Sequence, residues 1–225
     1  MMTLETFKLT LLDSLYYNSV LDSGAAGAVV SVHWVGDIAI TYAICRSLSI
    51  GNLSSKITST PHYEELLDSL FIASVAHSID TVKMLPIYDF STSFMSEGYY
   101  DYVAFNATRN SPFRNWIRKQ GIAAGNVFYF SIAYRNHFSL PDSFSIRLGN
   151  MRSCIARVDK IKGDVLSDYD IWGNAYTADL IRKRWNTGSD PISSPTSQRE
   201  MLSSYYVVVK GLDQQAWGKL VSPFE

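Results

Sequence analysis

The sequence has 225 residues, of which 47% are hydrophobic, 13% aromatic and 18% charged, and its formal net charge is −1. This composition indicates a folded chain with a sizeable core and excludes an intrinsically disordered one. No apolar stretch reaches the roughly eighteen residues that a membrane-spanning helix needs, and the N-terminus lacks the pattern of a secretory signal. Two cysteines in apolar contexts, Cys45 and Cys154, indicate buried thiols in a reducing compartment. We therefore expect a cytoplasmic protein.

The near-neutral total conceals an uneven distribution of charge along the chain. Residues 1–105 carry 4 Lys/Arg and 11 Asp/Glu, whereas residues 106–160 carry 9 Lys/Arg and 2 Asp/Glu. A strongly basic middle favours a polyanionic partner. Arginines that are solvated or that face acidic residues of the first half are an equally good explanation at this point.

The first predicted element in chain order is a strand over 5–17, where apolar and polar residues alternate. Apolar residues at helical spacing predict a helix over 32–48, and a second, shorter helix is predicted to begin near residue 61. Residues 82–110 are rich in aromatic residues and alternate with polar ones, which predicts further strands. The first half therefore combines strands with helices.

The second half is predicted to consist mainly of strands. Residues 111–126 indicate a basic loop or short helix, and residues 127–135 a strand. Residues 144–161 alternate as one long strand, or as a bent pair with Gly149 at the bend. Residues 161–200 are rich in serine, proline and glycine towards their end, which predicts a loop-rich excursion over the surface.

This order of elements, completed by a last core strand at 203–212, predicts a single α+β domain over residues 1–225. A ferredoxin-like (RNA-recognition-motif-like) sheet with helices on one face fits the order. The basic strands would then lie in a sheet whose other face or edge is open.

The sequence contains no motif for an enzyme, a metal site or a cofactor. Its four histidines form no pair at metal-ligand spacing, and there is no phosphate-binding glycine-rich loop or nucleophile elbow. We therefore expect a protein without catalytic activity. A metal-independent endoribonuclease that uses His33 or His137 stays open as the alternative, because such a site assembles in space and leaves no motif.

Binding to nucleic acid has stronger support in the basic stretch, where arginines alternate with amide and aromatic side chains. In the segment SIRLGNMR, Gly149 allows a close approach of the backbone, and Arg147 and Arg152 can hold phosphates on either side of it. The alternatives are aromatic residues that only build the core, with solvated arginines around them, or a scaffolding protein without any role in nucleic-acid binding. The predicted RNA contacts are Arg147, Gly149, Asn150, Arg152, Arg109, Arg114, Tyr134 and Arg135.

Three stretches of the chain resemble a known family. They are FKLTLLDSLYYNS near the start, GDIAITYAIC in the predicted helix, and VFYFSIAYR followed by LPDSFSIRLGNMRSCIARV. Together they are similar to the Cas-five-type small backbone subunit of the type I-D CRISPR Cascade, over roughly residues 4–50 and 95–160. The sequence departs from the expected pattern at Asn150, where a lysine is expected.

The resemblance implies a non-catalytic subunit of a CRISPR RNA-guided complex that targets DNA. Such a subunit grips the 5′ handle of the guide RNA, caps the filament of stacked backbone subunits and contacts the large subunit. Duplex DNA beside the protospacer-adjacent motif is a further candidate ligand of the same basic region. The resemblance implies no membrane contact.

Overall fold

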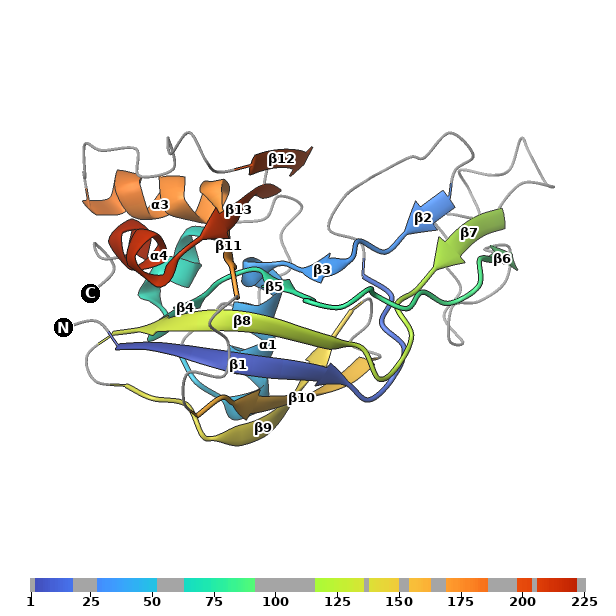
Figure 1. The fold of residues 1–225 in the computed structure, drawn as a ribbon, viewed down its shortest axis with the longest axis horizontal. Coiled ribbons are helices and arrows are strands. Elements are labelled where there is room, and N and C mark those ends of the chain that lie inside the picture. The colour runs from blue at the N-terminus through green and yellow to red at the C-terminus, as the bar shows by residue number, and fades with distance from the viewer. Residues whose placement is uncertain are drawn as a thin grey trace.

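The computed structural model describes residues 3–17, 28–51, 63–91, 116–135, 138–149, 154–162, 169–185, 198–203 and 206–221. These residues form three sheets and a small number of helices, which confirms the predicted mixed α+β class. In Figure 1 the long strands of the main sheet cross the lower half of the molecule, with helix α1 behind them. The C-terminal helices lie above the sheet, and a small three-stranded sheet lies to the right.

The main sheet is built around strand β1 (Thr3–Leu11), which pairs with β8 (Val127–Tyr134) on one side and with β10 (Cys154–Lys160) on the other. Strand β9 (Ser143–Leu148) continues the sheet beyond β10, and the strands run in the order β3-β5-β8-β1-β10-β9. The neighbouring strands described in this sheet are antiparallel, and a short connection can join β9 to β10, which follow one another in the chain. The predicted strand at 5–17 is confirmed up to Leu11, where β1 ends. The predicted strand at 127–135 is confirmed as β8, and that at 144–161 is confirmed as the pair β9 and β10.

From Phe7 onward, one face of β1 is apolar and faces the core. Phe7, Leu9 and Leu11 are at most 1% exposed, whereas the polar residues between them are partly exposed. This is the period-2 alternation expected of a strand with one buried face. The registers place Phe7 opposite Phe130 and Leu9 opposite both Phe128 and Val158, so the strands bring a continuous apolar layer together.

Helix α1 (Asp37–Leu48) covers this apolar layer and packs against β9 and β4 (Phe71–Ala73). It begins later than the predicted residue 32, because Trp34–Val35 form the short strand β3 and pair with β5 (Ala76–His77). The helix ends at Ser49, whose φ of 55° reverses the chain.

Two predicted elements have a different form in the structure. The expected helix near residue 61 is the short 3-10 helix η1 (Tyr63–Asp68), which ends where the chain enters strand β4. The basic loop or short helix expected at 111–126 is wrong over 116–120, since Trp116–Gln120 form strand β7, while residues 111–115 lie outside the described residues. Strand β7 pairs with β2 (Ala28–Val30) and β6 (Tyr88–Ser91), partners distant in sequence, and this pairing decides its conformation.

The chain after residue 170 forms a second layer with its own core. Strands β11 (Ile171–Asn174), β12 (Gln198–Ser203) and β13 (Tyr206–Leu212) make a three-stranded sheet, which packs with α3 (Ala175–Trp185) and α4 (Gln214–Val221). Its interior includes the buried side chains of Leu180, Ile181, Val209 and Trp217. The loop-rich excursion predicted for 161–200 is therefore wrong over 171–185. The predicted last strand is confirmed, although it lies in this second sheet.

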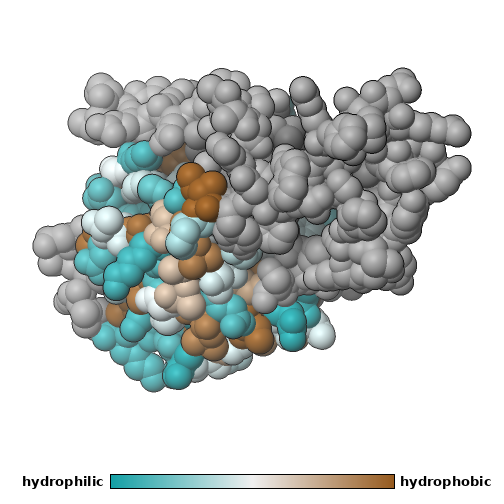
Figure 2. Space-filling model, turned by 90° about the vertical axis from the view of Figure 1, so that its right-hand side faces the viewer, coloured by the Kyte–Doolittle hydropathy of each residue, from teal (hydrophilic) through white to brown (hydrophobic). Residues whose placement is uncertain are grey.

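The surface of the described residues is mixed in polarity. Figure 2 shows an interrupted stripe of hydrophobic residues with hydrophilic residues on both sides of it. Within the described ranges, no helix is both long enough and apolar enough to cross a membrane.

A buried polar junction joins α1 to the second layer. Asp37, only 1% exposed, accepts a hydrogen bond from Asn174 Nδ2 at 2.9 Å and a second one from the hydroxyl of Thr177. Burial raises the pKa of the Asp37 carboxyl, and the hydrogen bonds from Thr177 and Asn174 oppose this shift. The first turn of α1 is thereby tied to the start of α3.

Replacing Asp37 tests this junction. Asp37→Leu leaves the donors of Asn174 and Thr177 without their acceptor, and we expect the free energy of unfolding to fall by about 3 kcal/mol. Asp37→Asn should cost less, because the amide oxygen can still accept from Asn174 and the amide nitrogen can donate to the Thr177 hydroxyl. Urea unfolding followed by circular dichroism measures both values.

The same variants test the direction of the pKa shift. Because the folded-state pKa of Asp37 lies above its usual value of 3.8, the protonated carboxyl stabilises the fold fully below pH 3.8. This contribution is lost as the pH rises through the folded-state pKa. The stability of the wild type relative to Asp37→Asn should therefore fall from pH 3.8 towards neutral pH, and a rise over that window would contradict the assignment.

Candidate functional site

A groove of about 650 Å³ lies between helix α1 and strand β9, where the main sheet ends. This volume is within the range of pockets that hold small organic ligands. One wall comes from α1 and the other from the last residues of β9 and the glycine that follows them. The lining residues are Tyr17, Ala39, Tyr42, Ala43, Arg46, Ser47, Ser145, Ile146, Arg147, Leu148, Gly149 and Ile155.

Local periodicity places these side chains in the groove. The α1 residues that line it form two rows at a spacing of four, Ala39–Ala43–Ser47 and Tyr42–Arg46, which together make one face of a helix. The helix also buries Ile40 and Ile44 completely, on the side that packs against the sheet. Along β9, Ile146 and Leu148 are buried while Ser145 and Arg147 are exposed, as the alternation of a strand requires.

The groove is cationic. Arg46 and Arg147 line it from opposite walls, both are exposed, and no acidic residue is among the described residues that line it. Neither arginine forms an ion pair with a described carboxylate, although the guanidinium of Arg46 lies 5.9 Å from the centroid of the Tyr42 ring. The site therefore has two positive charges that are available to an anionic ligand.

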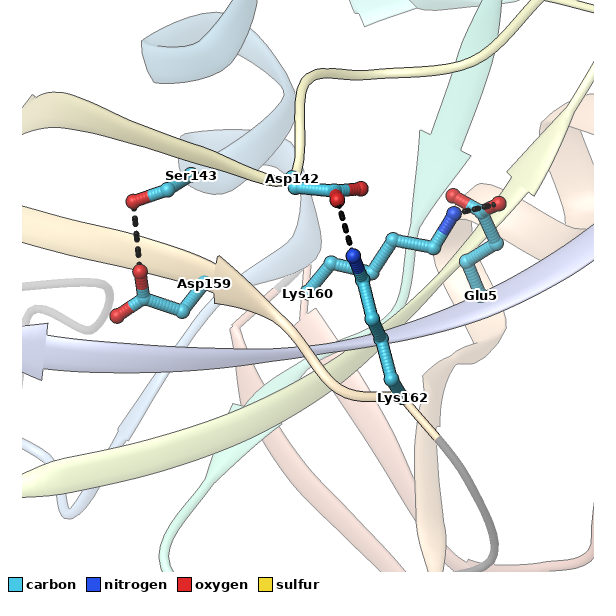
Figure 3. A network of polar contacts seen from close by, with 6 residues as sticks. All are labelled: Glu5, Asp142, Ser143, Asp159, Lys160 and Lys162. Atoms are coloured by element: carbon cyan, nitrogen blue, oxygen red, sulfur yellow. Dashed lines mark hydrogen bonds and ion pairs between the residues drawn. The ribbon is translucent and has the colours of Figure 1, made fainter.

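Three other basic residues, at the end of β10 and just after it, form ion pairs with carboxylates. Arg157 Nε lies 2.9 Å from Asp159 Oδ1, and Lys160 forms an ion pair with Glu5. Lys162 lies 2.5 Å from Asp142, and this contact holds the pKa of the Asp142 carboxyl below its usual value. Figure 3 shows the pairs that Lys160 and Lys162 make, together with the hydrogen bond from Ser143 to Asp159. Two of the nine basic residues of 106–160, Arg157 and Lys160, are thus paired within the protein, as is Lys162 just beyond that range.

Tyr42 is held in place on the helix wall. Its hydroxyl donates a hydrogen bond to Glu65 Oε1, and its ring meets the edge of Tyr63 at a centroid distance of 6.4 Å. Burial, followed by the hydrogen bond to Glu65, raises the pKa of the phenol. The phenol therefore stays protonated near neutral pH and keeps its role as a donor.

The sequence model of a known protein family matches most of the chain. The sequence model described as "Type I-D CRISPR-associated protein Cas5/Csc1" matches residues 2–185. The chain belongs to this family. No curated protein matched the sequence.

Membership of the Cas5/Csc1 family makes the chain a Cas5-type subunit of a type I-D CRISPR effector complex, with a role in antiviral defence. The matched range includes both walls of the groove and ends with α3. The resemblance stated from the sequence is therefore confirmed, and it extends further along the chain than the motifs that first carried it.

The predicted site residues of this Cas5/Csc1-family chain fall into four groups. Arg147 and Gly149 line the groove. Tyr134 is 2% exposed and its ring packs edge-on against Phe138, so it is a core residue in this fold and is dropped as an RNA contact. Arg135 is partly buried at the end of β8, where its backbone N–H donates to the Leu70 carbonyl oxygen. Asn150, Arg152, Arg109 and Arg114 lie outside the described residues.

Arg46, the second cation of the groove, is not among the RNA contacts predicted from the sequence. It follows Tyr42 by one helical turn, so the helix pattern could have placed the two side chains on one face. The pattern could not show that this face lies opposite β9. The described histidines, His33 and His77, supply nothing to the lining, and among the described residues no cluster of His, Cys, Asp and Glu could hold a metal ion.

Gly149 is required at the end of β9 for two reasons. Its φ is +80°, in the region where only glycine is unstrained. A Cβ at this position would also lie 2.8 Å from both Leu15 Cδ1 and the Tyr16 carbonyl oxygen. The backbone of β9 can therefore approach residues 15 and 16 closely, and this approach shapes one end of the groove.

Gly149→Ala should destabilise the protein by about 3 kcal/mol, because it adds a steric clash to the strain of a positive φ. Gly125→Ala is the matched control, since Gly125 has a φ of +83° with nothing within 4 Å of a Cβ. We expect this control to cost about 1 kcal/mol. Equal losses in thermal or urea unfolding would show that the close approach at Gly149 is not needed.

Proposed function

We propose that this subunit binds the 5′ handle of the guide RNA in the groove between α1 and β9. The observation that carries the proposal is the pair of arginines, Arg46 and Arg147, which face a common groove without any described carboxylate in its lining. Arginine is the side chain best suited to phosphate, because its planar guanidinium can donate two parallel hydrogen bonds. RNA shape and backbone charge would then provide most of the recognition.

The strand order supports a ferredoxin-like origin for the main sheet, which is the finer fold assignment that we propose. In that fold four strands joined as β-α-β-β-α-β form an antiparallel sheet with helices on one face. Here β1 leads through α1 to β4, which is antiparallel to β8, and β1 lies between β8 and β10. Within the described residues, β9 takes the place of the second helix between β8 and β10.

We propose that the subunit caps the filament of stacked backbone subunits and contacts the large subunit. Duplex DNA beside the protospacer-adjacent motif is a further proposed ligand of the basic region around the groove. Family membership supports assembly into such a complex in the cytoplasm.

We propose a non-catalytic role for the RNA site. The described lining of the groove contains neither a histidine nor a carboxylate, the groups that most often serve as general base in RNA cleavage. A handle RNA that stays intact during binding would support this proposal. Cleavage in the absence of divalent metal, lost on His33→Ala or His137→Ala, would overturn it in favour of an endoribonuclease.

Arg147→Ala tests the site directly. We expect the affinity for handle RNA to fall about tenfold, and the slope of log K against log salt concentration to decrease by about 0.7, as for one lost phosphate contact on a single strand. Fluorescence anisotropy at two or more salt concentrations measures both quantities, with a scrambled RNA of equal length for comparison.

Arg157→Ala is the matched control for this experiment. Arg157 also lies exposed on the main sheet, but Asp159 pairs with it, so its loss should change affinity and salt slope less. Equal effects of the two substitutions, or no effect of Arg147→Ala, would remove the groove as the handle site.

A further inference from the structure

We propose that Tyr42 and Arg46 form a preformed platform on which one base of single-stranded RNA stacks. The inference rests on the proposed function, and it names the chemical group that enters the groove. The guanidinium of Arg46 lies over the Tyr42 ring, 5.9 Å from its centroid, and both side chains line the groove. Unstacked bases are bound in proteins by such aromatic rings and guanidinium planes.

The helix face around the pair leaves space for a planar group. Ala39, Ala43 and Ser47 are the other α1 residues in the lining, and all three are small. Tyr42 and Arg46 are therefore the large side chains on this wall of the groove. The second wall, at the end of β9, supplies Arg147 for the phosphate of the same strand.

The aromatic part of the platform, Tyr42, is held in place within the protein itself. The Tyr42 hydroxyl is anchored on Glu65, and the ring packs edge-on against Tyr63, both from η1. Tyr63 is held in turn by Tyr176 at the start of α3, with centroids 6.2 Å apart and ring planes at 85°. These contacts reduce the rotamer freedom that binding would otherwise remove, so a base should stack at little entropic cost.

The shape of the site favours a single strand over a duplex. In a paired RNA helix the faces of the bases are stacked on their neighbours and cannot reach a side-chain plane. A groove of about 650 Å³ between one helix and one strand has room for a splayed nucleotide rather than for a duplex. We therefore expect the platform to act on an unpaired nucleotide of the handle.

The first experiment pairs Arg46→Lys with handle RNAs that are abasic at one position at a time. Lysine keeps the charge but removes the planar group, so intact RNA should bind about tenfold more weakly to Arg46→Lys than to the wild type. For one abasic position, the two proteins should bind equally well, because the stacking partner is already absent.

Two outcomes would overturn the inference while leaving the proposed function intact. In the first outcome, Arg46→Lys binds intact handle RNA as tightly as the wild type. In the second, each abasic position weakens the binding of both proteins by the same factor. In either case Arg147→Ala would still weaken RNA binding. If Arg147→Ala also has no effect, the groove itself is not the RNA site and the proposed function fails.

The second experiment separates positioning from electrostatics through two neighbouring glutamates. Glu64→Ala and Glu65→Ala remove the same charge from η1, but only Glu65 accepts the hydrogen bond from Tyr42. If charge alone mattered, both substitutions would strengthen RNA binding. We expect Glu65→Ala to weaken binding, Glu64→Ala to leave it unchanged or slightly stronger, and Glu65→Gln to restore most of the affinity. Equal strengthening by both alanine variants would contradict the role of the anchored Tyr42.

Discussion

Burial of one face of strand β1 is the constraint on which the other features of this protein depend. Phe7, Leu9 and Leu11 are removed from water, and each contributes roughly 2 kcal/mol through its burial. The flanking strands β8 and β10 extend the apolar layer, and helix α1 is the element that covers it. Because α1 packs on this face, it lies beside β9, and the groove is the space between the two elements.

Charge pairing within the fold decides which cations remain for a ligand. The basic middle of the sequence suggests many phosphate contacts, yet Arg157 and Lys160, and Lys162 just after it, have carboxylate partners in the structure. A paired cation offers less to RNA, since an incoming phosphate must compete with the carboxylate that it already contacts. Arg147 lacks a described partner, and Arg46 comes from the acidic half of the chain.

The second layer of the molecule contacts helix α1 and η1, the elements that position one wall of the groove. Asp37 joins the start of α1 to Asn174 and Thr177, and Tyr63 connects Tyr42 to Tyr176. The wall that carries Tyr42 and Arg46 is thus held by contacts with α3 and the strand before it. The family match ends at residue 185, while the remaining strands and α4 complete the core against which α3 packs.

Local periodicity and motifs were enough to predict several features of this protein. These are the alternating strands β1 and β8, the helix that ends at Leu48, the strand pair around Gly149 and the family of the chain. Four other features become visible in the folded chain alone: residues 116–120 are a strand, residues 171–185 form a strand and a helix, Tyr134 is buried, and Arg46 lies across a groove from Arg147. The physical reason is that strand pairing, burial and charge pairing depend on partners far away in the chain, which no local pattern records.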